Sequence, residues 1–436
     1  MYTLMIALFV LGYAAIAFEH TIKIDKAASA LITGVVLWAV YVFSGADIHD
    51  TEHHLLEHLS EIASILFFLL GAMTIVEVVD AHEGFSVITD RIRTSKPVVL
   101  LWILAWLTFF MSAILDNLTT SIVMVSLIRK LIKDQNMRWL FGGVIVIAAN
   151  SGGAWSPIGD VTTTMLWIGG YVSTGNIISY IFLPSVAVLL APLLYLTFTL
   201  KGSIERPDEV ASTSSHDSIS QREKTTALLV GVGGLLFVPV FKTVTHLPPF
   251  MGMMLSLGIM WVVTDLLHRR KNAETRHEFG VLGVIRRIDT PSVLFFLGIL
   301  LAVASLQTAG QLRDLAGILD TRIGTTTQPG IYLVGGIIGL LSAIVDNVPL
   351  VAAAMGMYDM VPGTFFAPDD FFWKYLAFTA GTGGSVLIIG SAAGVAVMGL
   401  ERIPFGWYLK RISLLALLGY FAGIAVYAIQ RWIIIG

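Results

Sequence analysis

Long apolar runs are the feature that most constrains the fold of this chain. Apolar residues make up 56% of the 436 residues and charged residues only 13%, about half the share found in a typical soluble domain. So few charges cannot cover a water-facing surface, so most of the surface must face lipid. This excludes a soluble enzyme, a nucleic-acid-binding protein and a disordered scaffold. The net charge of −3 also offers no basic face for nucleic acid.

Ten segments have about the length and composition that a transmembrane helix needs. These candidate spans are 3–18, 27–44, 60–80, 138–169, 176–200, 226–243, 249–267, 291–309, 371–400 and 406–434. The first run lacks both a basic flank and a small-residue cleavage site, which predicts a retained span and not a signal peptide.

The distribution of basic residues predicts the orientation, because Lys and Arg remain in cytoplasmic loops. The loop 19–26 holds Lys23 and Lys26, whereas the loop 45–59 holds four His and no Lys or Arg. We therefore expect the N-terminus to lie outside. The hydrophilic segment 201–225 is then a cytoplasmic linker between two halves.

Two further apolar stretches, 98–133 and 330–360, are interrupted by Asp-Asn. Basic residues on both sides of the first stretch predict that it enters and leaves on the cytoplasmic side as a re-entrant hairpin. Its arm from Asn117 to Arg129 spans only about 18 Å as a helix, although its other arm is long enough to cross. Both arms of the second stretch are too short. Irregular backbone at membrane depth is stable only inside protein or along a watery cavity, so both tips should line one.

An internal repeat connects the two stretches. SAILDNL at 112–118 recurs as SAIVDNV at 342–348 with an offset of 230 residues, the glycine pair at 152–153 recurs at 383–384 with an offset of 231, and FFL at 67–69 recurs at 295–297 with an offset of 228. Matches in the same order at a near-constant offset indicate a duplication.

Each half then holds five spans and one hairpin, and because five is odd the second half is inverted. We predict an all-α polytopic membrane protein with two inverted repeats, an architecture typical of secondary transporters. The first repeat is 1–200, with hairpin 98–133 and a broken helix at 138–169. The second is 226–436, with hairpin 330–360 and a broken helix at 371–400.

The polar residues at the tips and breaks predict an ion site. An ionisable group inside a membrane costs about 2.5 kcal/mol or more, so it indicates function. The three carboxylates of Asp116, Asp160 and Asp346, with no cationic side chain at the tips and breaks, should attract a cation. The candidate ion- and proton-binding residues are Asp116, Asn117, Asn150, Asp160, Thr162, Thr163, Asp346 and Asn347. The candidate supporting residues are Ser112, Ser151, Ser342, Thr382 and Ser385.

The chemistry of these donors predicts exchange by competition. Carboxylate, amide and hydroxyl oxygens suit alkali and alkaline-earth cations, and the same carboxylates bind protons. A cation and protons that share one site can be exchanged across a membrane without a nucleophile, nucleotide or cofactor. A simpler role remains open for Thr120, Thr164 and Ser391, whose hydroxyls could serve only to cap exposed backbone.

Three motifs resemble the NhaD family of Na⁺/H⁺ antiporters: LDNLTT at 115–120, NSGGAWSPIGDVTT at 150–163 and DNVP at 346–349. That family belongs to an ion-transporter superfamily that also contains arsenite-pump-type and dicarboxylate carriers. The resemblance implies exchange of Na⁺ or Li⁺ for H⁺ in an inner membrane by a homodimer. Carried over by position, it implies that the candidate residues above line the ion path. Asp116, Asn117, Asp346 and Asn347 are then the expected Na⁺ ligands.

Other functions remain open. A dicarboxylate or oxyanion carrier would share the hairpins but needs an anion-binding site, usually formed by helix N-termini and neutral hydroxyls. The three carboxylates argue against such a site. The segment 54–58 matches H-x-x-E-H, a metalloprotease pattern of three fixed residues, although paired charges on an interfacial helix or pH sensing by the His cluster at 49–58 also explain it. Glu77 and Asp80 either line a proton path or lie at the membrane interface.

Overall fold

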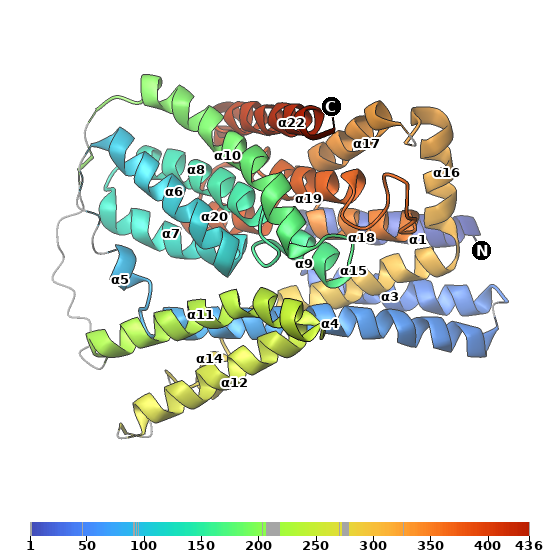
Figure 1. Ribbon diagram of the computed structural model, residues 1–436, viewed down its shortest axis with the longest axis horizontal. Helices are drawn as coiled ribbons and strands as arrows, with labels where there is room; N and C mark the ends of the chain where they lie inside the picture. Colours follow the sequence, from blue (N-terminus) through green and yellow to red (C-terminus); the bar gives the residue numbers. More distant parts are fainter. Residues whose placement is uncertain are drawn as a thin grey trace.

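The computed structural model describes residues 2–45, 47–89, 92, 94, 96–202, 204–205, 219–269, 271–272, 279–325 and 327–435. Within these ranges every regular element is a helix (Figure 1). Among the described residues, eight helices are long and apolar enough to cross a membrane, and four shorter apolar helices accompany them. The chain is therefore a polytopic helical membrane protein, as predicted. Residues 206–218, most of the predicted linker, lie outside the described residues.

The first half of the chain forms ten helices over its described residues. They are α1 (Tyr2–Ala17), α2 (Glu19–Ile22), α3 (Lys26–Phe43), α4 (Ile48–Ala81), α5 (Ser86–Thr89), α6 (Pro97–Leu115), α7 (Asn117–Leu131), α8 (Gln135–Ala154), α9 (Val161–Ile168) and α10 (Thr174–Thr199). The interrupted stretch 98–133 and the predicted broken helix 138–169 are each divided into two helices. The first division is at Asp116 and the second at 155–160.

The second half forms eleven helices over its described residues. Its described helices are α11 (Gln221–Thr245), α12 (Pro249–His268), α14 (Val281–Val284), α15 (Thr290–Thr308), α16 (Gln311–Ile323), α17 (Gln328–Leu341), α18 (Asn347–Met357), α19 (Phe371–Gly383), α20 (Ala392–Glu401), α21 (Phe405–Arg411) and α22 (Ser413–Ile435). Two details go beyond the predicted spans. A further helix, α16, lies between the candidate span 291–309 and the stretch 330–360, and the candidate span 406–434 is divided at Ile412 into α21 and α22.

Helix α4 corrects the predicted boundary of the third span. The sequence predicts a separate external segment at 45–59 and a span at 60–80, but one helix runs from Ile48 to Ala81. The Asp47 carboxylate caps its start by accepting hydrogen bonds from the amides of His49 and Asp50, and no proline interrupts it. Its 34 residues extend about 51 Å. Because a hydrocarbon core is about 30 Å thick, the polar first turns extend beyond it.

Equivalent residues of the two halves pack in the same way. Ser112 Oγ donates to the Ala149 carbonyl at 2.6 Å, and Ser342 Oγ donates to the Ala380 carbonyl at 2.9 Å. Both bonds join the helix before an Asp-Asn tip to the helix that follows the hairpin. The serines of the two recurring SAI motifs thus make matching hydrogen bonds.

Glycines make the same close approach possible in both halves. A methyl group on Gly152 would overlap the Phe109 carbonyl oxygen, and one on Gly383 would overlap that of Gly339. Only glycine lets these backbones approach so closely. Helices α6 and α17, which lead to the tips, are thus held against α8 and α19 by backbone contact.

The second helix of each hairpin packs against the other half of the chain. Helix α7 of the first half packs against α20 of the second, and α18 of the second packs against α9 of the first. Between them α8 and α19 pack against each other at the centre of the molecule (Figure 1). This crossing brings both tips and both breaks into one region.

Two arginines paired with one buried carboxylate hold one of these crossings. The Glu401 side chain at the end of α20 is 2% exposed and accepts from Arg129 Nε at 2.6 Å and Arg138 Nε at 2.9 Å. These arginines belong to α7 and α8. Because a buried carboxylate is costly unless paired, these two ion pairs fix α20 against the first half.

Candidate ion-binding site

Four helix N-termini meet at a small cavity of about 70 Å³. They are those of α7, α9, α18 and α20, and each begins directly after a tip or a break. The residues at their N-caps are Asp116, Asp160, Asp346 and Ser391. An isolated helix N-terminus attracts anions, so three acidic caps convert this arrangement into one that can accept a cation.

Asp160 is the most enclosed of the three carboxylates, at 1% exposure. Asn117 Nδ2 donates to Asp160 Oδ2 at 2.6 Å, and the backbone amide of Thr162 donates to Asp160 Oδ1 at 2.8 Å. The Thr162 hydroxyl donates to the same oxygen. The first tip and the first break are therefore joined at this carboxylate.

Asn150 connects this cluster to the second half. Its Oδ1 accepts from Asn117 Nδ2 at 3.1 Å. Its Nδ2 donates to Ser385 Oγ at 3.0 Å and to Ser391 Oγ at 2.9 Å. Asn150 is fully buried, so a continuous polar chain runs from Asp160 through two amides to the second break.

Asp116 and Asp346 line the same cavity from the two tips. Asp116 accepts from both the backbone amide and the hydroxyl of Thr119, each at 2.8 Å. Its φ of 80° is unusual for a residue with a side chain, which marks the sharp turn of the tip. Asp346 accepts from the amide of Val348 at 3.2 Å.

Sequence reasoning missed one charge at this site. Lys26 Nζ lies 3.4 Å from Asp346 Oδ2 and 4.5 Å from the centre of the Phe295 ring. Lys26 begins α3 and belongs to the predicted loop 19–26, outside the tips and breaks whose charges were counted, so the count omits it. Nothing in the linear sequence places residue 26 beside residue 346.

The remaining candidate residues divide into two groups. Asn347, 7% exposed, lines the cavity. Thr163, Ser151 and Thr382 instead direct their hydroxyls to backbone carbonyls within their own broken helices, so they stabilise the breaks. Ser391, considered above only as a cap, both caps α20 and accepts from Asn150.

Residues 13–381 match a family model described as a citrate transporter, CitMHS. The chain belongs to the CitMHS family. This is a family of transporters and not of enzymes, which removes the metalloprotease hypothesis for residues 54–58.

Named relatives of this CitMHS chain include plant and bacterial antiporters. It is 50% identical over 425 residues to sodium/proton antiporter 1 of Arabidopsis thaliana, covering 97% of this chain and 71% of the relative. It is 47% identical to sodium/proton antiporter 2 of the same plant, covering 97% and 98%. It is 30% identical to the Na⁺/H⁺ antiporter NhaD of Vibrio cholerae, covering 96% and 90%. The resemblance to NhaD antiporters is thereby confirmed.

Proposed function

We propose that the protein exchanges Na⁺ or Li⁺ for H⁺ across a membrane by competition at Asp116, Asp160 and Asp346. The observation that most supports this is the Asn117 bridge from Asp160 to Asn150 beside the cavity that holds all three carboxylates. Oxygen donors of this kind suit a hard monovalent cation, and the same carboxylates accept protons. The names of the relatives agree with this function.

In this proposal the Na⁺ ligands are Asp116, Asn117, Asp346 and Asn347, which all line the cavity. Asp160 then titrates behind them, oriented by Thr162 and Asn117. Loss of a proton from the cluster and entry of Na⁺ leave the local charge unchanged. That balance favours occupation by one or the other and not by both.

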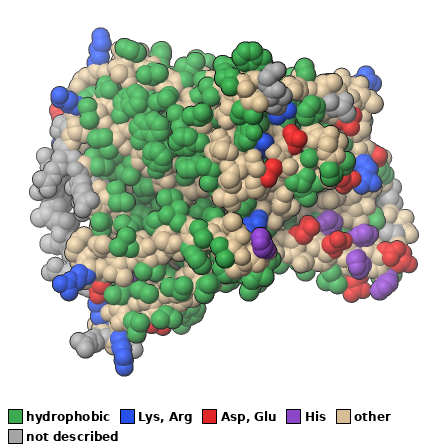
Figure 2. Space-filling model, in the orientation of Figure 1, with side chains coloured by type: hydrophobic (Ala, Val, Ile, Leu, Met, Phe, Trp, Pro, Cys, Tyr) green, Lys and Arg blue, Asp and Glu red, His purple; other side chains and the backbone are tan. Residues whose placement is uncertain are grey.

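The proposal includes an inverted arrangement of the two repeats, with re-entrant hairpins at 98–133 and 330–360. Ten crossings would return the chain to the side on which it starts. Acidic and His side chains gather over the end where α4 begins (Figure 2). Helix α4 itself contains neither Lys nor Arg, so by the positive-inside rule that end, and the N-terminus with it, would lie outside.

We further propose that the protein lies in the inner (cytoplasmic) membrane, assembles as a homodimer and serves pH homeostasis. Li⁺ is included as a substrate because the site offers the same oxygen donors to both ions.

A citrate or other organic-anion carrier is the alternative that the family description raises. Such a carrier would use the four helix N-termini directly for the substrate carboxylates. Three of those N-termini are already occupied by aspartates here, which favours the cation.

The experiment that separates these functions uses the purified protein in sealed vesicles with an imposed pH gradient. Na⁺, Li⁺, K⁺ and citrate are added separately while a pH-sensitive dye reports the gradient. We expect dissipation with Na⁺ and Li⁺, and its loss in Asp346→Asn. The control is Asp359→Asn, because Asp359 is 80% exposed, pairs with Arg313 and does not line the ion-binding cavity. Citrate uptake, or unchanged exchange by Asp346→Asn, would contradict the proposal.

A further inference from the structure

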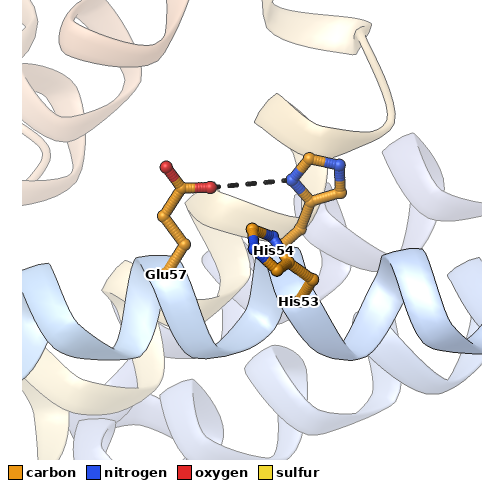
Figure 3. A group of neighbouring side chains, drawn as sticks. All are labelled: His53, His54 and Glu57. Carbon is orange, nitrogen blue, oxygen red and sulfur yellow. Dashed lines mark ion pairs between the residues drawn. The ribbon is translucent and has the colours of Figure 1, made fainter.

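The first turns of α4 carry a second cluster of ligand-type side chains, outside the cavity described above. His53, His54 and Glu57 each offer a donor atom, and these three atoms lie within 4.8 Å of one another. Figure 3 shows the His54 ring turned toward the Glu57 carboxylate, with the His53 ring beside it. All three residues are exposed, so an ion can reach them from solution at little desolvation cost.

We propose that His53, His54 and Glu57 bind a divalent late transition metal ion such as Zn²⁺. His54 Nδ1 and Glu57 Oε2 are 3.8 Å apart, which is too long for a hydrogen bond. Two metal–ligand bonds of about 2.0–2.1 Å at a tetrahedral angle separate their donor atoms by about 3.3 Å. A shift of about half an ångström would therefore place both atoms on one ion.

The donor types select the class of metal. Two imidazoles and one carboxylate suit Zn²⁺, Ni²⁺ or Cu²⁺, whereas Na⁺, Mg²⁺ and Ca²⁺ prefer oxygen alone. Water completes the coordination of such a site. The His53 ring is perpendicular to that of His54, with the centres 6.0 Å apart, so it approaches from a different direction, as a tetrahedral ion requires.

The charges around the cluster favour a cation. Asp50, Glu52 and Glu61 lie on the same helix, and α4 contains neither Lys nor Arg. An adjacent cavity of about 450 Å³ has Arg313 as the one Lys or Arg among its described lining residues, and Arg313 pairs with Asp359 at 3.5 Å.

The site lies at the edge of this second cavity, which is lined by His54, Glu57 and residues of α15 and α18. This cavity and the ion-binding cavity share none of their lining residues. The proposed metal site is thus independent of the proposed exchange, and each can fail without the other.

The test measures Zn²⁺ binding to the full-length protein, purified without a histidine tag, by titration calorimetry. We expect one ion per chain, and binding weakened at least about tenfold in each of His53→Ala, His54→Ala and Glu57→Gln. His49→Ala is the matched control, since His49 is exposed in the first turn of the same helix but outside the cluster. Co²⁺ in place of Zn²⁺ should give the strong visible absorption of a four-coordinate ion.

Two results would overturn the proposal. One is Zn²⁺ binding unchanged in the His54→Ala/Glu57→Gln double variant. The other is binding lost in His58→Ala but retained in His53→Ala, because the ion would then lie between His54 and His58. Matching unfolding temperatures without metal would show that the variants are folded.

Discussion

Lys26 and Asp346 form an ion pair across 320 positions of sequence, with 3.4 Å between Nζ and Oδ2. The pair joins the start of α3 to the tip of the second hairpin. Both residues line the ion-binding cavity and also a third cavity of about 140 Å³, so the pair lies between the two. A cation from the protein itself therefore occupies one of the carboxylates proposed to bind Na⁺.

The first prediction concerns Lys26→Gln. Removal of the competing ammonium should let Na⁺ bind Asp346 more strongly, because two unit charges about 4 Å apart interact by about 1–4 kcal/mol between water and a protein surface. We expect an apparent KM for Na⁺ that is several-fold lower, measured as Na⁺-dependent proton efflux from vesicles. Lys23→Asn serves as the control, because Lys23 is an exposed residue nearby. An unchanged KM would show that Lys26 does not compete.

The second prediction concerns Asn117→Ala. The substitution removes the amide that donates to Asp160 and to Asn150. A hydrogen bond to a charged group contributes about 1.5–3 kcal/mol, so exchange should fall about 10- to 100-fold. Asn176→Ala is the control, since the Asn176 side chain makes an exposed hydrogen bond to Ser173 Oγ, outside the cavity. Equal rates for the two variants would contradict the assigned role.

The third prediction uses the matched glycines. Gly152→Ala and Gly383→Ala should both destabilise the protein by several kcal/mol, since overpacking a filled contact typically costs about 1–3 kcal/mol and here the obstacle is backbone. Gly399→Ala in α20 meets no atom within 4 Å and should be neutral or slightly stabilising. Unfolding temperatures in detergent measure all three. Similar temperatures for Gly383→Ala and Gly399→Ala would mean that the close approach is not required.

The fourth prediction rests on a histidine pair that joins α4 to α12. His82 Nδ1 donates to the Val78 carbonyl at 2.7 Å, and the Nε2 atoms of His82 and His268 are 3.2 Å apart. One Nε2 must accept and the other donate, and with both rings neutral it is His268 that donates and His82 that accepts. Burial also lowers the pKa of His82 below its ordinary value of 6.5.

The unfolded chain therefore binds more protons at this position than the folded one. Stability should rise with pH and should be lost as the pH falls below about 6.5. The unfolding temperature should decrease between about pH 7.5 and about pH 5.5, and this decrease should be smaller in His82→Gln than in His49→Gln. Identical pH profiles would exclude a contribution from the pair.

The sequence predicts most of the architecture because the relevant signals are local. Apolar length locates the spans, and Asp116, Pro157 and the glycine pairs locate the tips and breaks. The boundary of α4 was misplaced because hydropathy reports lipid exposure, whereas the helix continues through polar residues capped by Asp47.

The acidic and amide residues proposed from the sequence lie together in the structure, but the sequence does not predict how they are connected. Asp160, Asn117 and Asn150 each carry a polar signal in an apolar segment. The pairing of Lys26 with Asp346, and the reach of Asn150 to Ser391, depend on how α3 and α20 pack. No periodicity or motif in one segment reports such a long-range contact.

The most direct test of the account is the pH dependence of Na⁺ uptake into vesicles, measured as initial rates at several Na⁺ concentrations. If Na⁺ and H⁺ compete for the same carboxylates, the apparent KM for Na⁺ should rise by up to about tenfold for each unit of pH decrease, with the maximal rate unchanged. Asp160→Asn should abolish uptake or remove this dependence. A maximal rate that falls with pH while KM stays constant would show that the two ions do not share a site.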